Sequence, residues 1–315
     1  MLEELVVQAH PERLGASSVW ARQHVEDPHR PLSLPAPERA RLPVDQDRRP
    51  YPASVRQTLK AALARGIPTM GGPSGATLLI YHRVGGGSLD ERDLAPAEFV
   101  RQLDVLVGHD LLALDSALDR LDRGDTRPSV VLTFDDGFAD VHQHAWPVLQ
   151  ERGLPFTLYL ATSFLGATMH WDGSTAKAAG PALSWGQVEE MVASGLCTLG
   201  NHTHRHVRPE RLTALELDEC TGAIEARLGV TPRHFAYPWG TAVPAMTAEL
   251  AVRFRSACTG ELGRNAPGGD PLLLRRIPVR RTDPLPFFEA KLRGLGPERA
   301  YSGMVRAAKA VGARA

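Results

Sequence analysis

The chain has 315 residues, of which 43% are hydrophobic, so it is long enough to bury a sizeable core as one large or two modest domains. Its 36 lysines and arginines equal its 36 aspartates and glutamates, a balance that argues against a nucleic acid or an anionic membrane as partner. The cysteines Cys197, Cys220 and Cys258 show no metal-binding or redox spacing, and we expect buried free thiols rather than disulfides.

The N-terminus lacks the pattern of a targeting signal. Glu3 and Glu4 stand where a signal peptide carries basic residues, and no apolar stretch follows them. No apolar run elsewhere is long enough to cross a bilayer. We therefore expect a cytoplasmic protein without an integral membrane segment.

Residues 1–74 differ in composition from the rest of the chain. Segments 30–37 and 45–52 are rich in proline and charge and poor in β-branched residues, so they can bury little apolar area. One short helix is predicted over 54–65, where apolar residues recur at helical spacing. The glycine-rich segment 71–75 reads as a linker. We expect an irregular, proline-rich N-terminal extension.

Strand-like and helix-like segments alternate from residue 76 onward. The predicted strands are 77–81, 130–134, 156–161, 197–200, 234–237 and 273–279. A helix is predicted over 96–107, and capping-box patterns at Ser184 and Thr213 begin two more, which Gly195 and Gly229 are placed to end. This alternation predicts a parallel sheet wrapped by helices, either open or closed into a barrel. In such folds the chemistry usually lies at the carboxyl ends of the strands.

Two neighbouring carboxylates end the strand predicted over 130–134. They belong to the run Thr-Phe-Asp-Asp-Gly at 133–137. Successive side chains of a strand point to opposite faces, so Asp135 and Asp136 cannot play the same role without a bend. A metal bound by one would keep it ionised and leave the other to accept protons.

A second polar run, Asn-His-Thr-His-Arg-His at 201–206, follows the strand predicted over 197–200. His202 and His206 are four residues apart, so they would share a face if this segment formed a helical turn. Two neutral imidazoles and one carboxylate make a three-ligand site with an open position for water, as catalytic zinc requires. Zinc (Zn2+) suits this donor set, and nickel, cobalt or iron are chemically acceptable. Such a metal would acidify its water and polarise a carbonyl, which is the chemistry of hydrolysis.

The two runs together resemble the motifs of the polysaccharide deacetylase superfamily (NodB-like domain). The resemblance implies a distorted (β/α)7 barrel over a domain of residues 75–295, followed by a C-terminal helix or tail at 296–315. It implies that the first aspartate, Asp135, is the general base. The implied ligands of the divalent metal are Asp136, His202 and His206.

The third motif of the family departs from its commonest form, because 235–240 reads Phe-Ala-Tyr-Pro-Trp-Gly and lacks the usual arginine. The late histidine motif has no match after residue 260. Both departures resemble the deacetylases of poly-β-1,6-N-acetylglucosamine, in which the acid histidine comes early, after a strand ending Tyr-His. This resemblance implies His82 as the acid and the Trp239 backbone N–H as the oxyanion donor. Tyr237 is either a substrate contact or a core residue, and Arg276 is expected to orient Asp135 in place of the missing arginine.

The leading hypothesis is a metal-dependent hydrolase that removes N-acetyl groups from poly- or oligosaccharides containing N-acetylglucosamine and releases acetate. The alternative is a deacetylase of a small cytoplasmic N-acetylated precursor or of another non-peptide C–N amide. A third hypothesis is a non-catalytic carbohydrate-binding barrel, which would not need a metal-activated water. The substrate is a carbohydrate in the first and third cases, and the oligomeric state is left open.

Overall fold

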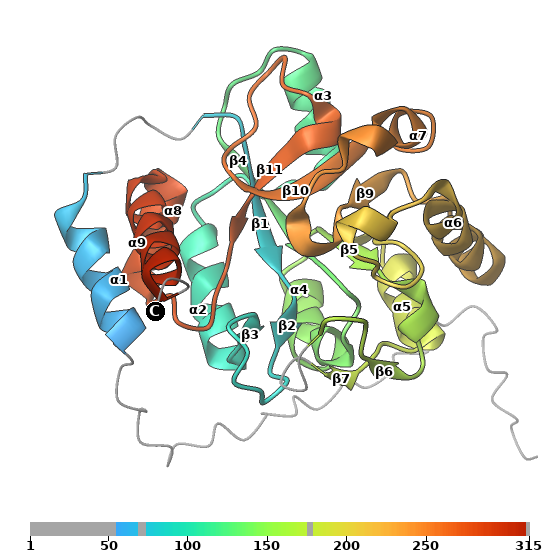
Figure 1. The fold of residues 1–315 in the computed structure, drawn as a ribbon, viewed down its shortest axis with the longest axis horizontal. Helices are drawn as coiled ribbons and strands as arrows, with labels where there is room; N and C mark the ends of the chain where they lie inside the picture. Colours follow the sequence, from blue (N-terminus) through green and yellow to red (C-terminus); the bar gives the residue numbers. More distant parts are fainter. Residues whose placement is uncertain (1–54, 69–73, 175–178, 313–315) are drawn as a thin grey trace, which may run out of the picture. The chain divides into compact units, whose positions relative to one another are not determined.

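The computed structural model describes residues 55–68, 74–174 and 179–312, with side chains to residue 307. Most of the predicted N-terminal extension and its linker lie outside the described residues, so their irregular character stays a prediction. Seven parallel strands close into a barrel in the order β1-β11-β10-β9-β8-β5-β4 (Figure 1). The strands are β1 (Ala76–Tyr81), β4 (Ser129–Phe134), β5 (Phe156–Leu160), β8 (Cys197–Asn201), β9 (His234–Ala236), β10 (Ser256–Leu262) and β11 (Leu274–Pro278). The predicted (β/α)7 barrel is confirmed.

Helices connect and cover the barrel strands. They are α1 (Val55–Gly66), α2 (Pro96–Leu106), α3 (Leu114–Asp122), α4 (Trp146–Glu151), α5 (Trp185–Ala193), α6 (Ala214–Leu228), α7 (Thr247–Ala251), α8 (Leu285–Arg293) and α9 (Gly296–Gly312). Two short strand pairs are β2 (Arg83–Val84) with β3 (Asp93–Leu94), and β6 (Thr168–Met169) with β7 (Gly180–Pro181). No helix in the described ranges has both the length and the apolar character needed to cross a membrane.

The sequence does not predict one barrel strand, β10. Its residues include a single β-branched side chain and no aromatic one, so local propensity does not favour a strand. It forms because β9 and β11 pair with it in parallel on both sides. Ser256, Ala257 and Cys258 are buried there, and the tertiary pairing overrides the weak local signal.

The side chains inside the barrel alternate with those that pack beneath the helices. Seven interior strand residues cluster with α3: Ala76, Leu78, Val131, Tyr159, Ala236, Cys258 and Leu274. Their neighbours Leu79 and Leu132 belong to the outer cluster instead. Because alternate residues of a strand share a face, Asp135 continues the inward row of Val131, and Arg276 that of Leu274. The interior is therefore apolar near α3 and charged at the carboxyl ends of the strands.

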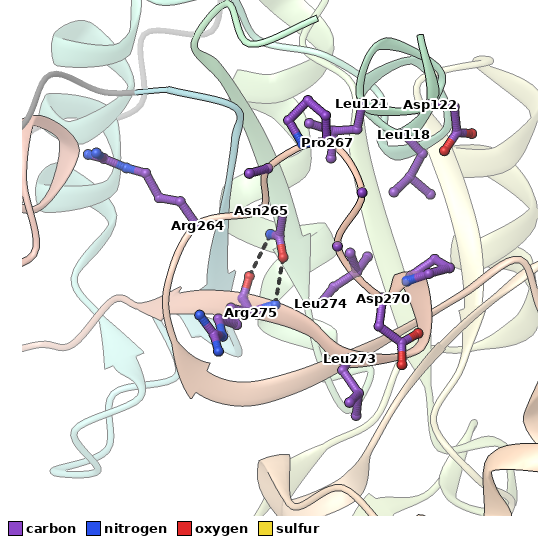
Figure 2. A pocket seen from close by; sticks show the side chains of 14 residues that line it. Leu118, Leu121, Asp122, Arg264, Asn265, Pro267, Asp270, Leu273, Leu274 and Arg275 are labelled. Carbon is purple, nitrogen blue, oxygen red and sulfur yellow. Dashed lines mark hydrogen bonds between the residues drawn. The ribbon is translucent and has the colours of Figure 1, made fainter. Parts of the chain in front are cut away.

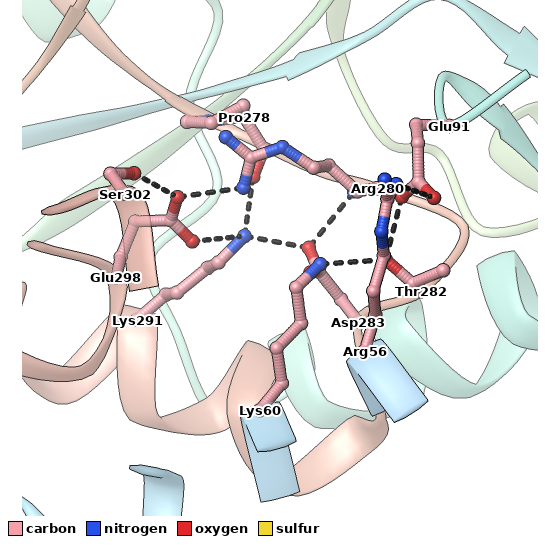
Figure 3. A network of polar contacts seen from close by, with 10 residues as sticks. All are labelled: Arg56, Lys60, Glu91, Pro278, Arg280, Thr282, Asp283, Lys291, Glu298 and Ser302. Atoms are coloured by element: carbon pink, nitrogen blue, oxygen red, sulfur yellow. Dashed lines mark hydrogen bonds and ion pairs between the residues drawn. The ribbon is translucent and has the colours of Figure 1, made fainter. Parts of the chain in front are cut away.

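The helix predicted over 54–65 is present as α1, which packs against α8 and α9. Its Lys60 is fully buried and donates to Oδ1 of Asp283 at 2.7 Å and to Oγ1 of Thr282 at 2.7 Å. Figure 3 shows that Lys291 reaches the same aspartate from the other side, at 2.6 Å from Oδ2. This network of buried charges ties α1 to the segment that follows β11. The three cysteines are buried and free, as expected.

A cavity of about 470 Å³ lies at the amino-terminal end of the barrel (Figure 2). It is bordered by α3 and by the segment between β10 and β11. Asn265 in this segment donates to the Arg275 carbonyl and accepts the Arg275 N–H, each at 2.9 Å. None of the residues singled out in the sequence lines this cavity, because those residues follow the carboxyl ends of the strands.

Candidate metal centre and active site

The chain bends sharply after β4. Asp136 has φ 76° and Gly137 has φ 103°, and a positive φ is uncommon for a residue with a side chain. The backbone N–H of Asp135 still donates to the Tyr81 carbonyl at 3.0 Å, so the strand pairing holds up to the bend. Asp135 remains in the inward row while Asp136 reaches the two histidines. Two carboxylates at successive strand positions can serve one site only if the backbone bends between them, and the backbone bends at Asp136.

Asp136, His202 and His206 come together as a buried cluster. The Oδ1 atom of Asp136 lies 3.3 Å from Nε2 of each histidine, and the three candidate ligand atoms all lie within 4.8 Å of one another. The Oδ2 atom of Asp136 is buried without a hydrogen-bond partner in the part of the chain that the structure describes. Two imidazole nitrogens and a carboxylate with a spare oxygen fit a divalent cation such as zinc.

The segment that holds the two histidines is not a helical turn, so their four-residue spacing is not what brings them together. His202 directly follows β8, and the segment through His206 is irregular, with φ 64° at Thr203 and 49° at His206. Nδ1 of His202 donates to the Ala236 carbonyl at 2.8 Å, so Nε2, which faces Asp136, is the candidate ligand atom. The ring of His206 lies against Trp171, with ring centroids 4.1 Å apart.

Helix α6 holds this irregular segment in place. Glu216 accepts the Arg205 backbone N–H at 2.9 Å and the Arg205 guanidinium at 2.5 Å. The predicted capping box at Thr213 is therefore only half formed: the Thr213 hydroxyl accepts the Glu216 N–H at 3.4 Å, but the Glu216 side chain is engaged elsewhere. His204, at a position that varies in the family motif, turns away from the cluster and bonds Thr162 Oγ1 at 2.9 Å.

The charges around Asp136 keep it ionised. Burial opposes ionisation, but the hydrogen bonds from His202 and His206 outweigh burial and hold the pKa of Asp136 well below its usual value. A carboxylate that is ionised at all physiological pH values can bind a cation without first losing a proton.

Arg276 holds Asp135 with a two-pronged contact. Its Nη1 and Nη2 atoms donate to Oδ1 and Oδ2 of Asp135 at 2.7 and 2.8 Å, and its Nε donates to the Thr259 carbonyl at 2.9 Å. In the strand register Arg276 pairs with Leu78 of β1, several residues before the carboxyl end of the barrel. The long Arg276 side chain extends towards that end to reach Asp135. Burial alone would raise the pKa of Asp135, but Arg276 holds it below the usual value.

His82 follows β1 and joins the same group of charges. Its Nδ1 is buried without a hydrogen-bond partner among the described residues. Burial lowers the pKa of His82 to about 4, against the opposing attraction of Asp136 and Asp135. The imidazole is therefore neutral at neutral pH in the protein without substrate.

The third motif contributes one residue to the site. Trp239 has φ 63° and a side chain that is 43% exposed, and its ring centroid lies 5.7 Å from that of His206. The turn needs glycine next to it, because a Cβ on Gly240 would lie 2.7 Å from Cα of Gly260. Tyr237 is not brought to the site: it is buried in the apolar cluster of β9 and α7. As a substrate contact it is a wrong prediction, since strand alternation turns it outward.

A buried ion pair that the sequence does not predict joins two segments of the site. Nε of Arg83 donates to Oδ2 of Asp140 at 2.7 Å, and the Val84 backbone N–H donates to Oδ1 at 3.1 Å. The pair ties the residue after His82 to the loop that begins with Asp136, and both partners are about 5% exposed. Their only local signal is proximity in sequence to the site residues, since the contact joins β2 to the segment that follows β4.

A family model described as "Polysaccharide deacetylase" matches residues 122–253. The structure of IcaB from Ammonifex degensii is 32% identical, with a TM-score of 0.60, and the match covers 70% of this chain and 97% of that one. A polysaccharide deacetylase from Bacillus cereus, at 22% identity and a TM-score of 0.59 over 70% of each chain, shares the fold.

Among curated proteins, the poly-beta-1,6-N-acetyl-D-glucosamine N-deacetylase of Staphylococcus epidermidis is 28% identical over 146 residues, which are 41% of this chain and 48% of that protein. The chain thus spans about half the length of the curated relatives that it matches. The barrel, the two motifs and the similarity to IcaB over nearly its whole length lead to one conclusion: this chain belongs to the polysaccharide deacetylase family.

Proposed function

We propose that this protein is a metal-dependent N-deacetylase that hydrolyses the acetamide group of N-acetylglucosamine units in a poly- or oligosaccharide. The observation that carries the proposal is the buried cluster of Asp136, His202 and His206 beside the Arg276–Asp135 pair. A divalent cation bound by the cluster would supply a Lewis acid and acidify water at the site.

The protein side chains provide the proton transfers of the reaction. Asp135, held by Arg276, takes a proton from the attacking water as the water oxygen bonds to the acetamide carbon. The backbone N–H of Trp239 is suited to stabilise the carbonyl oxygen as it gains charge. His82 gives a proton to the nitrogen as the C–N bond breaks, so that acetate and a free amine leave.

The pKa of His82 sets a condition on this role. With a pKa of about 4 before substrate binds, His82 holds a proton only in a small fraction of molecules at neutral pH. A proton donor must be protonated when the nitrogen leaves, so the negative charge that builds up on the substrate has to raise the pKa of His82 in the complex.

The substrate class is supported by the relatives rather than by the cluster alone. The Staphylococcus epidermidis protein is named as a deacetylase of poly-β-1,6-N-acetylglucosamine, and the early His82 and the 235–240 motif match that branch. A small N-acetylated precursor is the second candidate, because the same cluster, together with Asp135 and His82, would cleave its amide equally well.

The test measures acetate release from N-acetylglucosamine and from its β-1,6 and β-1,4 oligomers, with zinc or cobalt restored after chelation. Release that requires metal and increases with oligomer length is the expected result, and release from monomers alone would favour the precursor. Asp135→Asn should keep bound metal and lose activity. Full activity in that variant would refute the assignment of the base.

A further inference from the structure

A second pocket lies beside the metal centre. It has a volume of about 330 Å³, and its walls come from the segment after β5 and the segment after β8. The metal-ligand candidate His206 lines it, as does Trp171, which packs on that histidine. We call it the arginine pocket, after its lining residues Arg205, Arg208 and Arg211. A sugar unit adjoining the one at the metal centre would be within reach of this pocket.

The arginine pocket is lined by three guanidinium groups and a single carboxylate, that of Asp172. Arg205 is satisfied by Glu216 at 2.5 Å and Glu219 at 2.8 Å. Arg208 and Arg211 share a single carboxylate oxygen of Asp172, at 3.9 and 3.8 Å, which is beyond hydrogen-bonding distance. Two guanidinium groups thus face one carboxylate that is itself 73% exposed, and among the described residues neither of them donates a hydrogen bond to a carboxylate.

Arg208 is held in position before any ligand arrives. Its guanidinium carbon lies 5.1 Å from the ring centroid of Trp239, a cation–π arrangement. On the other side the Arg208 guanidinium lies against Gly173, where a Cβ added to the glycine would be 2.1 Å from Nη2 of Arg208. The guanidinium plane is therefore fixed between the two loops, and a fixed planar fork matches the two oxygens of a carboxylate or a phosphate.

We propose that the arginine pocket binds an oxyanion substituent, a carboxylate or a phosphate, on the sugar unit next to the one that is deacetylated. The inference rests on the proposed function for the identity of the neighbouring site and extends it by naming a preference for anionic polymer. Arg211 can be replaced without disturbing the site, because its side chain is 69% exposed, whereas Arg208 packs on Trp239.

The test uses three β-1,6-linked N-acetylglucosamine oligomers of equal length: a neutral one, one carrying a succinyl carboxylate on the neighbouring unit, and one carrying a phosphate there. Binding to the metal-loaded full chain is measured by calorimetry and acetate release is measured in parallel. We expect the anionic oligomers to bind roughly tenfold more tightly, an advantage that decreases as salt is added. The carboxylate and phosphate arms decide which oxyanion is preferred.

Variants separate this attraction from general effects. Arg211→Gln should reduce the affinity ratio of anionic to neutral oligomer, and Arg208→Lys, which keeps the charge but loses the planar fork, should reduce it as well. The matched control is Arg123→Gln, an exposed arginine just after α3, which should leave the ratio unchanged. All three variants should unfold at the same temperature as the parent protein within a few degrees.

Equal affinity for the neutral and anionic oligomers, or a preference that neither Arg211→Gln nor Arg208→Lys reduces, would overturn the proposal. A preference that decreases in Arg211→Gln and in Arg208→Lys, with no acetate released from any oligomer, would support the anion pocket and contradict the proposed hydrolysis. The binding and activity measurements thus distinguish the failure of one inference from the failure of the other.

Discussion

Replacing Arg276 by methionine tests the central pair of the site. Arg276 is completely buried and Asp135 is 3% exposed, so the substitution would leave a carboxylate in the barrel interior without its cation. Breaking such a buried pair typically costs about 3–5 kcal/mol, and the lost bond from Nε to the Thr259 carbonyl adds to this. In a domain of this size each kcal/mol shifts Tm by about 2–4 °C, so we expect a decrease of roughly 6–20 °C.

The pH dependence of this loss has a definite sign. Because Arg276 holds the pKa of Asp135 below its usual value, the pair stabilises the fold above the unfolded pKa of about 3.9. That contribution is lost as the pH falls through the folded pKa. The stability difference between Arg276→Met and the parent should therefore be largest near neutral pH. It should shrink as the pH falls, first because burial raises the pKa of Asp135 in the variant and the carboxyl takes up a proton there, and below about pH 4 because the parent loses its ion pair.

Urea unfolding monitored by circular dichroism, repeated from pH 3 to pH 8, measures both effects. The double variant Arg276→Met/Asp135→Asn removes both charges and should recover part of the stability, which gives a coupling energy between the two positions. Arg127→Met, at an exposed arginine paired with Asp125, is the control and should leave the midpoint unchanged. A loss below about 1 kcal/mol for Arg276→Met, or a loss independent of pH, would refute the buried ion pair.

Three further predictions concern other parts of the site and the fold. Asp136→Asn removes the only anionic ligand of the cluster, so it should abolish stoichiometric zinc or cobalt binding in equilibrium dialysis, while intact binding would exclude this residue as a ligand. If His82 donates the proton, kcat/KM, which reflects the free enzyme, should decrease as the pH rises above about 4. The value of kcat should stay constant to a higher pH, because substrate raises the pKa of His82. His82→Gln should remove both decreases, and unchanged profiles would eliminate His82 as the donor. Lys60→Met should cost about 1–3 kcal/mol in urea unfolding, because Asp283 keeps its contact with Lys291. No measurable cost would mean that the Lys60 contacts do not stabilise the fold.

Local patterns in the sequence were sufficient to locate most of the elements and the polar groups at strand ends. The strands with apolar, β-branched runs were found because burial on both faces leaves that signature in a parallel sheet. Ser184 was recognised as the start of a helix because its capping box depends only on residues within one turn, and the structure forms both of its hydrogen bonds. The carboxylates and imidazoles were identified because their types and order match one family.

The contacts between distant segments depended on the closure of the barrel. Arg276 meets Asp135 across 141 residues because β1 pairs with both β11 and β4, and no local pattern records that register. Strand β10 was missed for the same reason, since its neighbours rather than its own side chains make it a strand. The direction of Tyr237 and the irregular path from His202 to His206 were likewise decided by packing. Residue types and their order thus determined the chemistry available to this protein, whereas tertiary structure decided which groups share the site, because side-chain direction and distance depend on strand pairing and backbone bends.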